Sequence, residues 1–230
     1  MTGHLEELRA YLASVTGAIA GEPVSVQEMD CPAEGVAVRC AAPLRLQLNA
    51  GELAQKLQDL RPTLTYLGVR PIARVTHGGG HLFFELTGAL YTALLVQALG
   101  VYAPVPGPGP SAPHEDAVRA RISYTIRRMW MLARKAEGTP CCPENPAVQH
   151  ALLLTLAIPE RFHHPRGLRL RLLAASDALL CMTRSVLPRL RPGLCKNAAH
   201  VAELSLRILT LGLTTLYGPP EQPKEQEEQQ

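Results

Sequence analysis

The chain has 230 residues, of which 47% are hydrophobic and 19% charged, so its composition is that of a globular protein and not a disordered one. The sequence contains no apolar run long enough to span a membrane, and no signal-peptide pattern opens it. Its six cysteines have no regular spacing, which favours reduced thiols over a disulfide framework. These features predict a cytoplasmic protein that does not contact membranes.

Charge is distributed unevenly along the chain. Residues 1–114 contain 7 basic and 9 acidic side chains, whereas residues 115–210 contain 15 basic and 7 acidic ones. Residues 221–230 contain 1 basic and 4 acidic side chains and are expected to form an acidic, disordered tail. A positive block between acidic segments predicts a localised anionic partner, because solubility alone does not require such segregation.

The first hundred residues predict a small domain of mixed α and β structure. Apolar residues recur there with helical spacing in some segments and alternate as in strands in others. In chain order we expect a helix over 4–21, strands within 35–49 interrupted by Pro43, a helix over 50–60, two strands within 68–86 and a helix over 87–100.

Residues 101–114 predict a connector. Five prolines and two glycines lie between Pro104 and Pro113, and such a segment joins neither a helix interior nor a central strand. We therefore expect a fairly stiff, extended linker that separates the domain over 1–100 from a second domain over 115–220.

The second domain is predicted to be a bundle of four helices. Helical periodicity places the helices over 115–137, 146–158, 167–187 and 197–218. Pro188 is expected to end the third helix. The fourth is apolar on nearly every face and should be the central one, with Asn197 as its N-cap and Gly218 at its end. The fold class expected is α+β, with an N-terminal α/β domain and a C-terminal all-α bundle.

The helix over 115–137 combines a core stripe with two cationic flanks. At 100° per residue, Val118, Ile122, Ile126 and Met129 lie within one apolar stripe. The remaining positions pair rings with cations: Arg119, Arg127, Trp130 and Arg134 fall on one flank, and Arg121, Tyr124, Arg128 and Lys135 on the other.

Two interpretations of these flanks stay open. Guanidinium groups can hold phosphates while unpaired bases stack on Tyr124 and Trp130, at about 1–3 kcal/mol per base, as in single-stranded nucleic acid binding. Alternatively, the two rings pack on neighbouring helices and the arginines are merely solvated, since charged helix faces are common.

A family resemblance favours the first interpretation. The segment Arg119–Met129, RARISYTIRRM, resembles the stretch that opens the DALR-type anticodon-binding domain of arginyl-tRNA synthetases, with Ala120, Arg121 and Ile122 at matching positions. Ala117 and Arg119 depart from the family's Tyr and His, so its anticodon readers are not carried over to them. Residues 206–223 are similar to the family's last helix, and the resemblance covers 115–222. Residues 75–99 are weakly similar to the accessory domain that opens the same synthetases.

The catalytic part of such a synthetase has no counterpart in this sequence. The His-Ile-Gly-His and Lys-Met-Ser-Lys-Ser signatures are absent, and the Pro/Gly linker stands where the nucleotide-binding fold would be. The resemblance therefore implies a non-catalytic tRNA-binding protein, with tRNA-Arg as the candidate species. The eight flank residues named above are the expected RNA contacts, and we expect no catalytic residue, cofactor or metal ion.

Two rival functions come from other classes. The basic helix could bind an acidic protein, such as a synthetase or a tRNA-modifying enzyme, in an adaptor that does not touch RNA. An enzyme with its site in the first hundred residues is the other rival, although no recognisable constellation occurs there.

Three further motifs have structural explanations beside functional ones. His77–His81, HGGGH, is expected to form a tight turn between strands and not a metal pair. Cys141 and Cys142 are adjacent, which does not suit one tetrahedral zinc ion. The loop over 161–166, RFHHPR, is either a phosphate-contacting loop or a plain surface turn.

Overall fold

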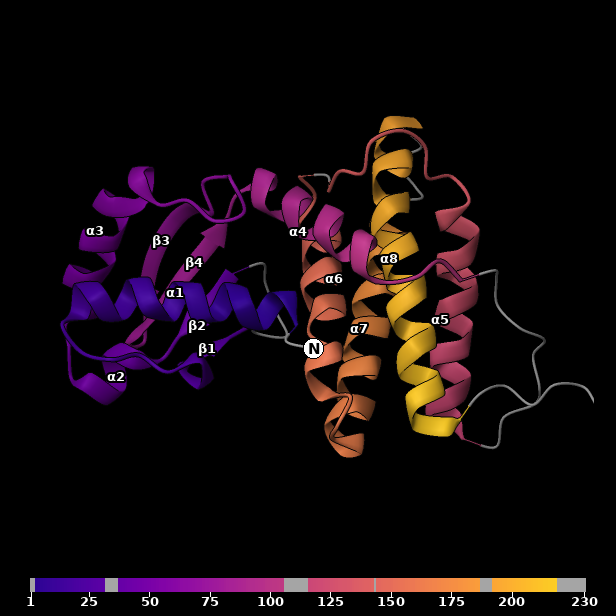
Figure 1. The fold of residues 1–230 in the computed structure, drawn as a ribbon, viewed down its shortest axis with the longest axis horizontal. Helices are drawn as coiled ribbons and strands as arrows, with labels where there is room; N and C mark the ends of the chain where they lie inside the picture. The colour runs from indigo at the N-terminus through magenta and orange to yellow at the C-terminus, as the bar shows by residue number, and fades with distance from the viewer. Residues whose placement is uncertain (1–2, 32–36, 106–115, 143, 187–191, 219–230) are drawn as a thin grey trace, which may run out of the picture.

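The computed structural model describes residues 3–31, 37–105, 116–142, 144–186 and 192–218, and shows a small sheet at one end and a group of long helices at the other (Figure 1). The N-terminal elements are α1 (His4–Ala20), η1 (Val26–Glu28), β1 (Met29–Asp30), β2 (Ala37–Cys40), α2 (Ala42–Leu46), α3 (Ala50–Leu60), η2 (Arg61–Thr63), β3 (Ile72–Gly78), β4 (His81–Leu86) and α4 (Gly88–Val101). The C-terminal elements are α5 (Ala117–Ala133), α6 (Pro146–Leu156), η3 (Pro159–Arg161), α7 (Pro165–Val186) and α8 (Pro192–Tyr217).

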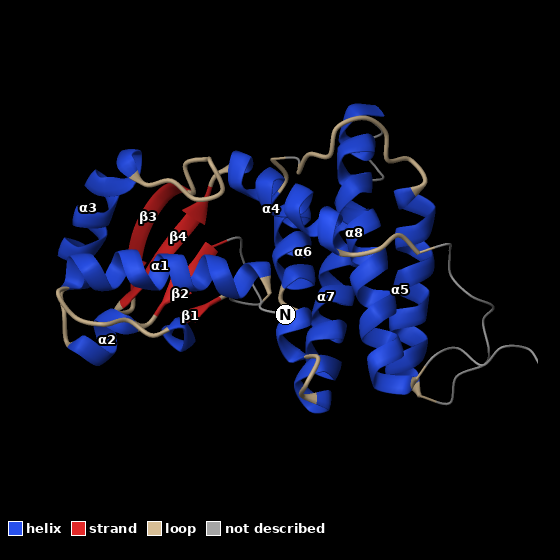
Figure 2. Ribbon diagram, in the orientation of Figure 1, coloured by secondary structure: helices blue, strands red, loops and turns tan. Residues whose placement is uncertain are grey.

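The strands form one antiparallel sheet in the order β1-β2-β4-β3. Burial alternates along β4, so Leu82, Phe84 and Leu86 face the core beneath α1 and α3. Figure 2 shows the strands gathered at one end with α1, α2 and α3 around them, and α5 to α8 at the other end. The α+β class predicted from the sequence is confirmed. None of the described helices is long and apolar enough to cross a membrane.

The glycine turn predicted between two strands is present. Gly78 pairs with His81, and the two residues between them, Gly79 and Gly80, have φ values of 56° and 76°. Positive φ at both central positions is the geometry of a type I′ hairpin turn, which matches the twist of the flanking strands and favours glycine.

Alanine at these two glycines should affect stability unequally. Gly79→Ala is expected to cost about 1–2 kcal/mol, because an L side chain must then adopt a left-handed backbone conformation. Gly80→Ala adds a collision between the new Cβ and Leu44 Cδ2, whereas at Gly79 the nearest atom is His81 Nδ1 at 3.9 Å.

Urea denaturation followed by circular dichroism compares the two variants. Leu44 is 54% exposed, so Leu44→Ala alone should be nearly neutral and should recover part of the Gly80→Ala loss in the double variant. Equal losses at Gly79 and Gly80 would contradict the collision with Leu44.

The expectation of strands on both sides of Pro43 is wrong for the second half of that segment. Only Ala37–Cys40 is a strand, and Ala42–Leu46 forms the short helix α2. Pro43 lacks the N–H that a sheet ladder needs, whereas the first turn of a helix leaves that position free. The alternation of leucines after Pro43 therefore belongs to a short helix and not to a strand.

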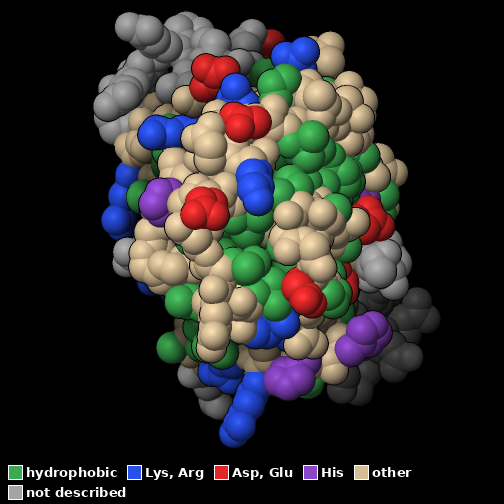
Figure 3. Space-filling model, turned by 90° about the vertical axis from the view of Figure 1, so that its left-hand side faces the viewer, with side chains coloured by type: hydrophobic (Ala, Val, Ile, Leu, Met, Phe, Trp, Pro, Cys, Tyr) green, Lys and Arg blue, Asp and Glu red, His purple; other side chains and the backbone are tan. Residues whose placement is uncertain are grey.

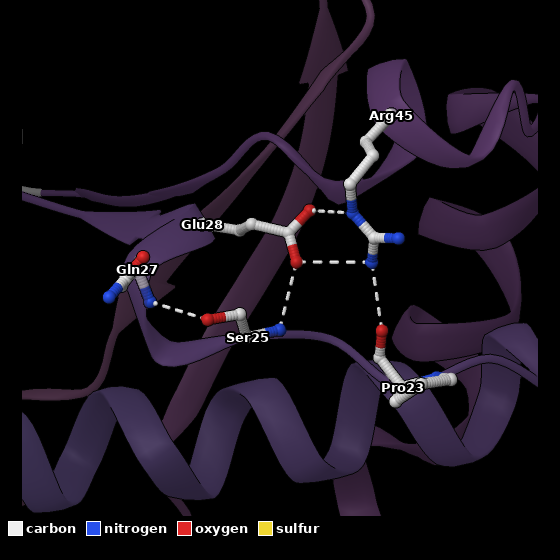
Figure 4. A network of polar contacts seen from close by, with 5 residues as sticks. All are labelled: Pro23, Ser25, Gln27, Glu28 and Arg45. Carbon is white, nitrogen blue, oxygen red and sulfur yellow. Dashed lines mark hydrogen bonds and ion pairs between the residues drawn. The ribbon is translucent and has the colours of Figure 1, made fainter.

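A polar network holds α2 against the segment that follows α1 (Figure 4). Arg45 donates to both carboxylate oxygens of Glu28, at 2.6 and 3.1 Å, and to the carbonyl of Pro23 at 2.8 Å. Glu28 also accepts the backbone N–H of Ser25. The hydrogen bonds from Arg45 lower the pKa of Glu28 below its usual value.

Helices α5 to α8 pack against one another. Helix α8 contacts α5, α6 and α7, in agreement with its predicted central position. Gly218, with φ of 81°, follows its last residue as expected. Asn197 is not an N-cap, because α8 begins at Pro192, a residue suited to a first helical turn. The first helix is shorter than predicted, ending at Ala133 and not near 137, and Pro188 lies outside the described residues.

The sheet end and the helical end share one continuous hydrophobic core. Helix α4 packs against α6 and α8, and the Arg207 guanidinium of α8 donates to the carbonyls of Leu99 and Tyr102 at the end of α4, at 2.8 and 2.6 Å. Elsewhere, Arg9 of α1 donates to Glu160 of η3 at 2.7 Å. Their side chains are only 14% and 6% exposed, so this ion pair is largely buried.

Candidate nucleic-acid surface

The core stripe predicted for the basic helix is the buried face of α5. Ile122, Thr125, Ile126, Met129 and Leu132 are buried against the neighbouring helices. Helix α5 lies at the end of the molecule farthest from the sheet (Figure 1), with α7 and α8 as its neighbours. Its opposite face therefore points to solvent.

Each predicted flank carries a guanidinium group stacked over an aromatic ring. The Arg128 guanidinium carbon lies 5.4 Å from the centre of the Tyr124 ring, and Arg128 Nε donates to the Tyr124 hydroxyl at 3.0 Å. On the other flank, Arg134 lies over Trp130 at 4.9 Å. Tyr124 is 49% exposed, whereas Trp130 is half-buried and packs partly on the core. Neither ring is fully buried.

Between these stacks the face is cationic and partly apolar. Arg127 and Lys135 are exposed and make no ion pair with any described residue. Met131, which the sequence did not single out, is 58% exposed between the two flanks. We define the α5 surface as the set of exposed or half-buried side chains on this face: Tyr124, Arg127, Arg128, Trp130, Met131, Arg134 and Lys135.

The other two predicted contacts, Arg119 and Arg121, have intramolecular partners. Arg121 pairs with Asp177 of α7, with Nε 2.8 Å from Oδ1. The Arg119 guanidinium lies 5.3 Å from the centre of the Tyr217 ring at the end of α8. These contacts join α5 to its neighbours, so the free positive charge is concentrated toward the C-terminal half of α5.

Asp116 fixes the other end of α5. It is the N-cap, accepting the backbone N–H of Val118 at 2.8 Å, and its other oxygen accepts the Tyr217 hydroxyl at 2.8 Å. Arg169 Nη2 lies 3.3 Å from the same carboxylate. The Tyr217 hydrogen bond, followed by the Val118 N–H, lowers the pKa of Asp116. This cluster ties the start of α5 to α7 and to the end of α8.

The RFHHPR loop lies at the end of the bundle where α5 begins. Arg161, His163, His164 and Arg166 are all exposed. His164 Nδ1 accepts the backbone N–H of Gly167 at 3.0 Å, so it caps the start of α7. The loop therefore has a structural role, and its contact with phosphate stays a prediction.

The other sequence motifs do not form a reactive constellation. Among the described residues, no group of three or more His, Cys, Asp and Glu side chains could hold a metal ion. Burial raises the pKa of the Cys31 and Cys142 thiols to about 12, which makes them inert at neutral pH. Cys181, in contrast, is exposed on α7.

The sheet end differs in character from the α5 surface. Figure 3 shows this end, where acidic and basic side chains are interspersed around hydrophobic ones. An open depression of about 490 Å³ lies beside α1, lined by small side chains such as Ala13 and Gly17 and by the turn through Val24. Glu22 is the one titratable residue in its lining.

Sequence reasoning missed residues whose position depends on packing between helices. Tyr217 meets Asp116 across 101 positions, which no local pattern reveals. Arg184 is exposed on α7, the helix beside α5, and its alignment with α5 needs the register of the two helices. Met131 could have been found from its position midway between the two flanks on the helical wheel.

Comparison with known proteins adds no relative: no family model, no curated protein and no solved structure matches this chain.

Proposed function

We propose that this chain is a non-catalytic tRNA-binding protein and that the α5 surface is where it contacts RNA. The observation that carries the proposal is the arrangement of four exposed cations on one solvent face, two of which, Arg128 and Arg134, stack on the rings of Tyr124 and Trp130. Helix α5 contains no acidic residue from Ala117 to Ala133 to neutralise them.

The chemistry of this face suits a folded single strand. Arginine and lysine attract phosphates, and a ring already covered on one side by a guanidinium group can receive a base on an accessible edge or face. Base stacking on aromatic side chains tolerates any sequence. The resemblance of residues 115–222 to a DALR-type anticodon-binding domain supports tRNA as the RNA class, with tRNA-Arg as the candidate species.

We further propose that the chain has two units, over 1–100 and 115–220, joined by the linker over 101–114 and followed by the acidic tail over 221–230. Contacts of α4 with α6 and α8, and of Arg9 with Glu160, would keep these units in a fixed relation. Such a fixed relation suits an RNA large enough to touch both.

Binding to tRNA should weaken steeply as salt rises, because each phosphate contact releases counterions. Replacing Arg127 and Arg128 together with glutamine should weaken tRNA binding about tenfold or more and reduce the salt slope by about 1.4. Fluorescence anisotropy with total tRNA and with a homopolymer, at several salt concentrations, measures both quantities.

A matched variant controls for the loss of net charge. Lys56→Gln with Arg70→Gln removes two exposed cations from the sheet end and should leave affinity and slope nearly unchanged. Undiminished binding by the Arg127/Arg128 variant would contradict the α5 surface. Absence of tRNA binding at low salt, together with co-purification of an acidic protein, would instead support the adaptor function.

A further inference from the structure

Helices α5 and α7 lie side by side and run in the same direction. Two ion pairs connect them, Asp116 with Arg169 and Arg121 with Asp177, and both partners advance along the chain together. In Figure 1 the two helices belong to the same end of the molecule. A seam between them is therefore exposed to solvent along one side.

Beyond the Arg121–Asp177 pair, the arginines along this seam make no ion pair with any described residue. Arg128 stands seven residues after Arg121, and Arg184 stands seven residues after Asp177, so each lies two turns farther along the same helix face. Both are exposed, and Arg184 makes no ion pair with any described residue. Tyr124 and Cys181, each about one turn after the Arg121–Asp177 pair on its own helix, are exposed.

Beyond the Arg121–Asp177 pair, every charged residue of the two helices is basic. After Asp177, helix α7 contains no acidic residue up to Val186, and α5 contains none at all. Packed helices lie about 8–10 Å apart, so Arg128 and Arg184 flank a strip about as wide as one nucleic acid strand. The exposed Tyr124 ring offers a stacking surface in that strip.

On the premise that the chain binds tRNA, we propose that a single RNA strand follows the seam between α5 and α7. Arg128 and Arg184 hold its phosphates from opposite sides, and Tyr124 stacks against an unpaired base. The strand passes over Cys181. Arg184 is thereby a second, previously unassigned part of the RNA site, contributed by α7.

The position of Arg184 also has a purely structural explanation. It lies in the last turn of α7, where a cation is favoured by the helix macrodipole. That explanation predicts a small loss of stability on its replacement and no effect on RNA affinity, so the two can be separated.

Alkylation of Cys181 in the wild-type protein tests the path of the strand without an amino-acid substitution. The protein is treated with N-ethylmaleimide with and without saturating total tRNA, and modification of each cysteine peptide is followed by mass spectrometry. Bound tRNA should slow the modification of Cys181 about fivefold or more, because a strand that tracks this groove would cover the thiol. Cys141, which precedes α6 and lies away from the seam, should react at an unchanged rate.

A substitution tests the role of Arg184 itself. Arg184→Gln should weaken tRNA binding about three- to tenfold and lower the salt slope by about 0.7, whereas Lys56→Gln should do neither. Suppose that tRNA binding depends on Arg127 and Arg128, but bound tRNA leaves Cys181 equally reactive and Arg184→Gln binds tRNA as tightly as wild type. The proposed path of the strand along the seam is then wrong, and the proposed function stands. If wild-type protein binds no tRNA, the proposed function itself fails.

Discussion

Replacing Arg9 with methionine is expected to lower the free energy of unfolding by about 3–5 kcal/mol, because Glu160 then remains as a buried, unpaired charge. The pair is largely buried between α1 and η3, and Arg9 also donates to the carbonyl of Met29 at 3.2 Å. For a protein of this length, such a loss corresponds to a fall in Tm of roughly 6–20 °C. Differential scanning calorimetry and urea denaturation measure it.

Neutralising both partners should recover part of this loss. Arg9→Met combined with Glu160→Gln leaves no unpaired charge, so the double variant should be more stable than Arg9→Met alone. A double variant no more stable than the single one would show that packing of the Arg9 stem, and not charge, dominates the effect.

The pH dependence of Arg9→Met follows from the pKa of Glu160. Burial raises this pKa above the usual 4.5, although Arg9 and Arg171 partly oppose the shift. Because the folded state then holds the proton more tightly than the unfolded state, stability increases as pH falls through the raised pKa toward 4.5. Removing Arg9 raises the pKa further, so Arg9→Met should regain more stability than wild type on mild acidification.

Replacing Arg207 with methionine is the second large expected loss, about 2–4 kcal/mol. The last carbonyls of a helix have no partner within it, and Arg207 supplies charged donors to two of those at the end of α4. It also pairs with Glu203 on its own helix. Urea denaturation measures the loss, and hydrogen exchange should show that the amides of α4 open more readily.

Arg184→Met provides the matched control, since it removes an exposed arginine from a neighbouring helix. Its free energy of unfolding should change by less than about 0.5 kcal/mol. If hydrogen exchange in α4 were the same in Arg207→Met and wild type, the contacts of Arg207 with Leu99 and Tyr102 would not be what secures that helix.

Local pattern was enough to predict most elements, because each depends on neighbours in sequence. The leucine spacing of α1 and the glycines after β3 both act within a few residues. The sequence pattern predicted the wrong element where the same alternation fits both a strand and a short helix. It predicted the wrong helix end where that end depends on other residues than the expected cap. Residues after Pro43 alternate as a strand does, yet proline favours the helix found there. Helix α8 begins five residues before Asn197, because Pro192 suits the first turn.

The candidate surface divides in the same way. The helical wheel correctly predicted which face of α5 is buried and which rings lie beside arginines, since both depend on one helix. It could not predict that Asp177 pairs with Arg121 or that Tyr217 lies beneath Arg119, because those contacts join separate helices. The function of the α5 surface residues as RNA contacts stays a prediction.

The attachment of α4 has a consequence for dividing this chain into pieces. A fragment that starts beyond Val101 would strip a hydrophobic cover from α6 and α8 and leave Arg207 without the carbonyls it serves. A fragment that stops near residue 105 would expose the same apolar helix to water. Thr87, the N-cap of α4, is therefore the natural starting residue for any shortened form that is meant to keep the helical end intact.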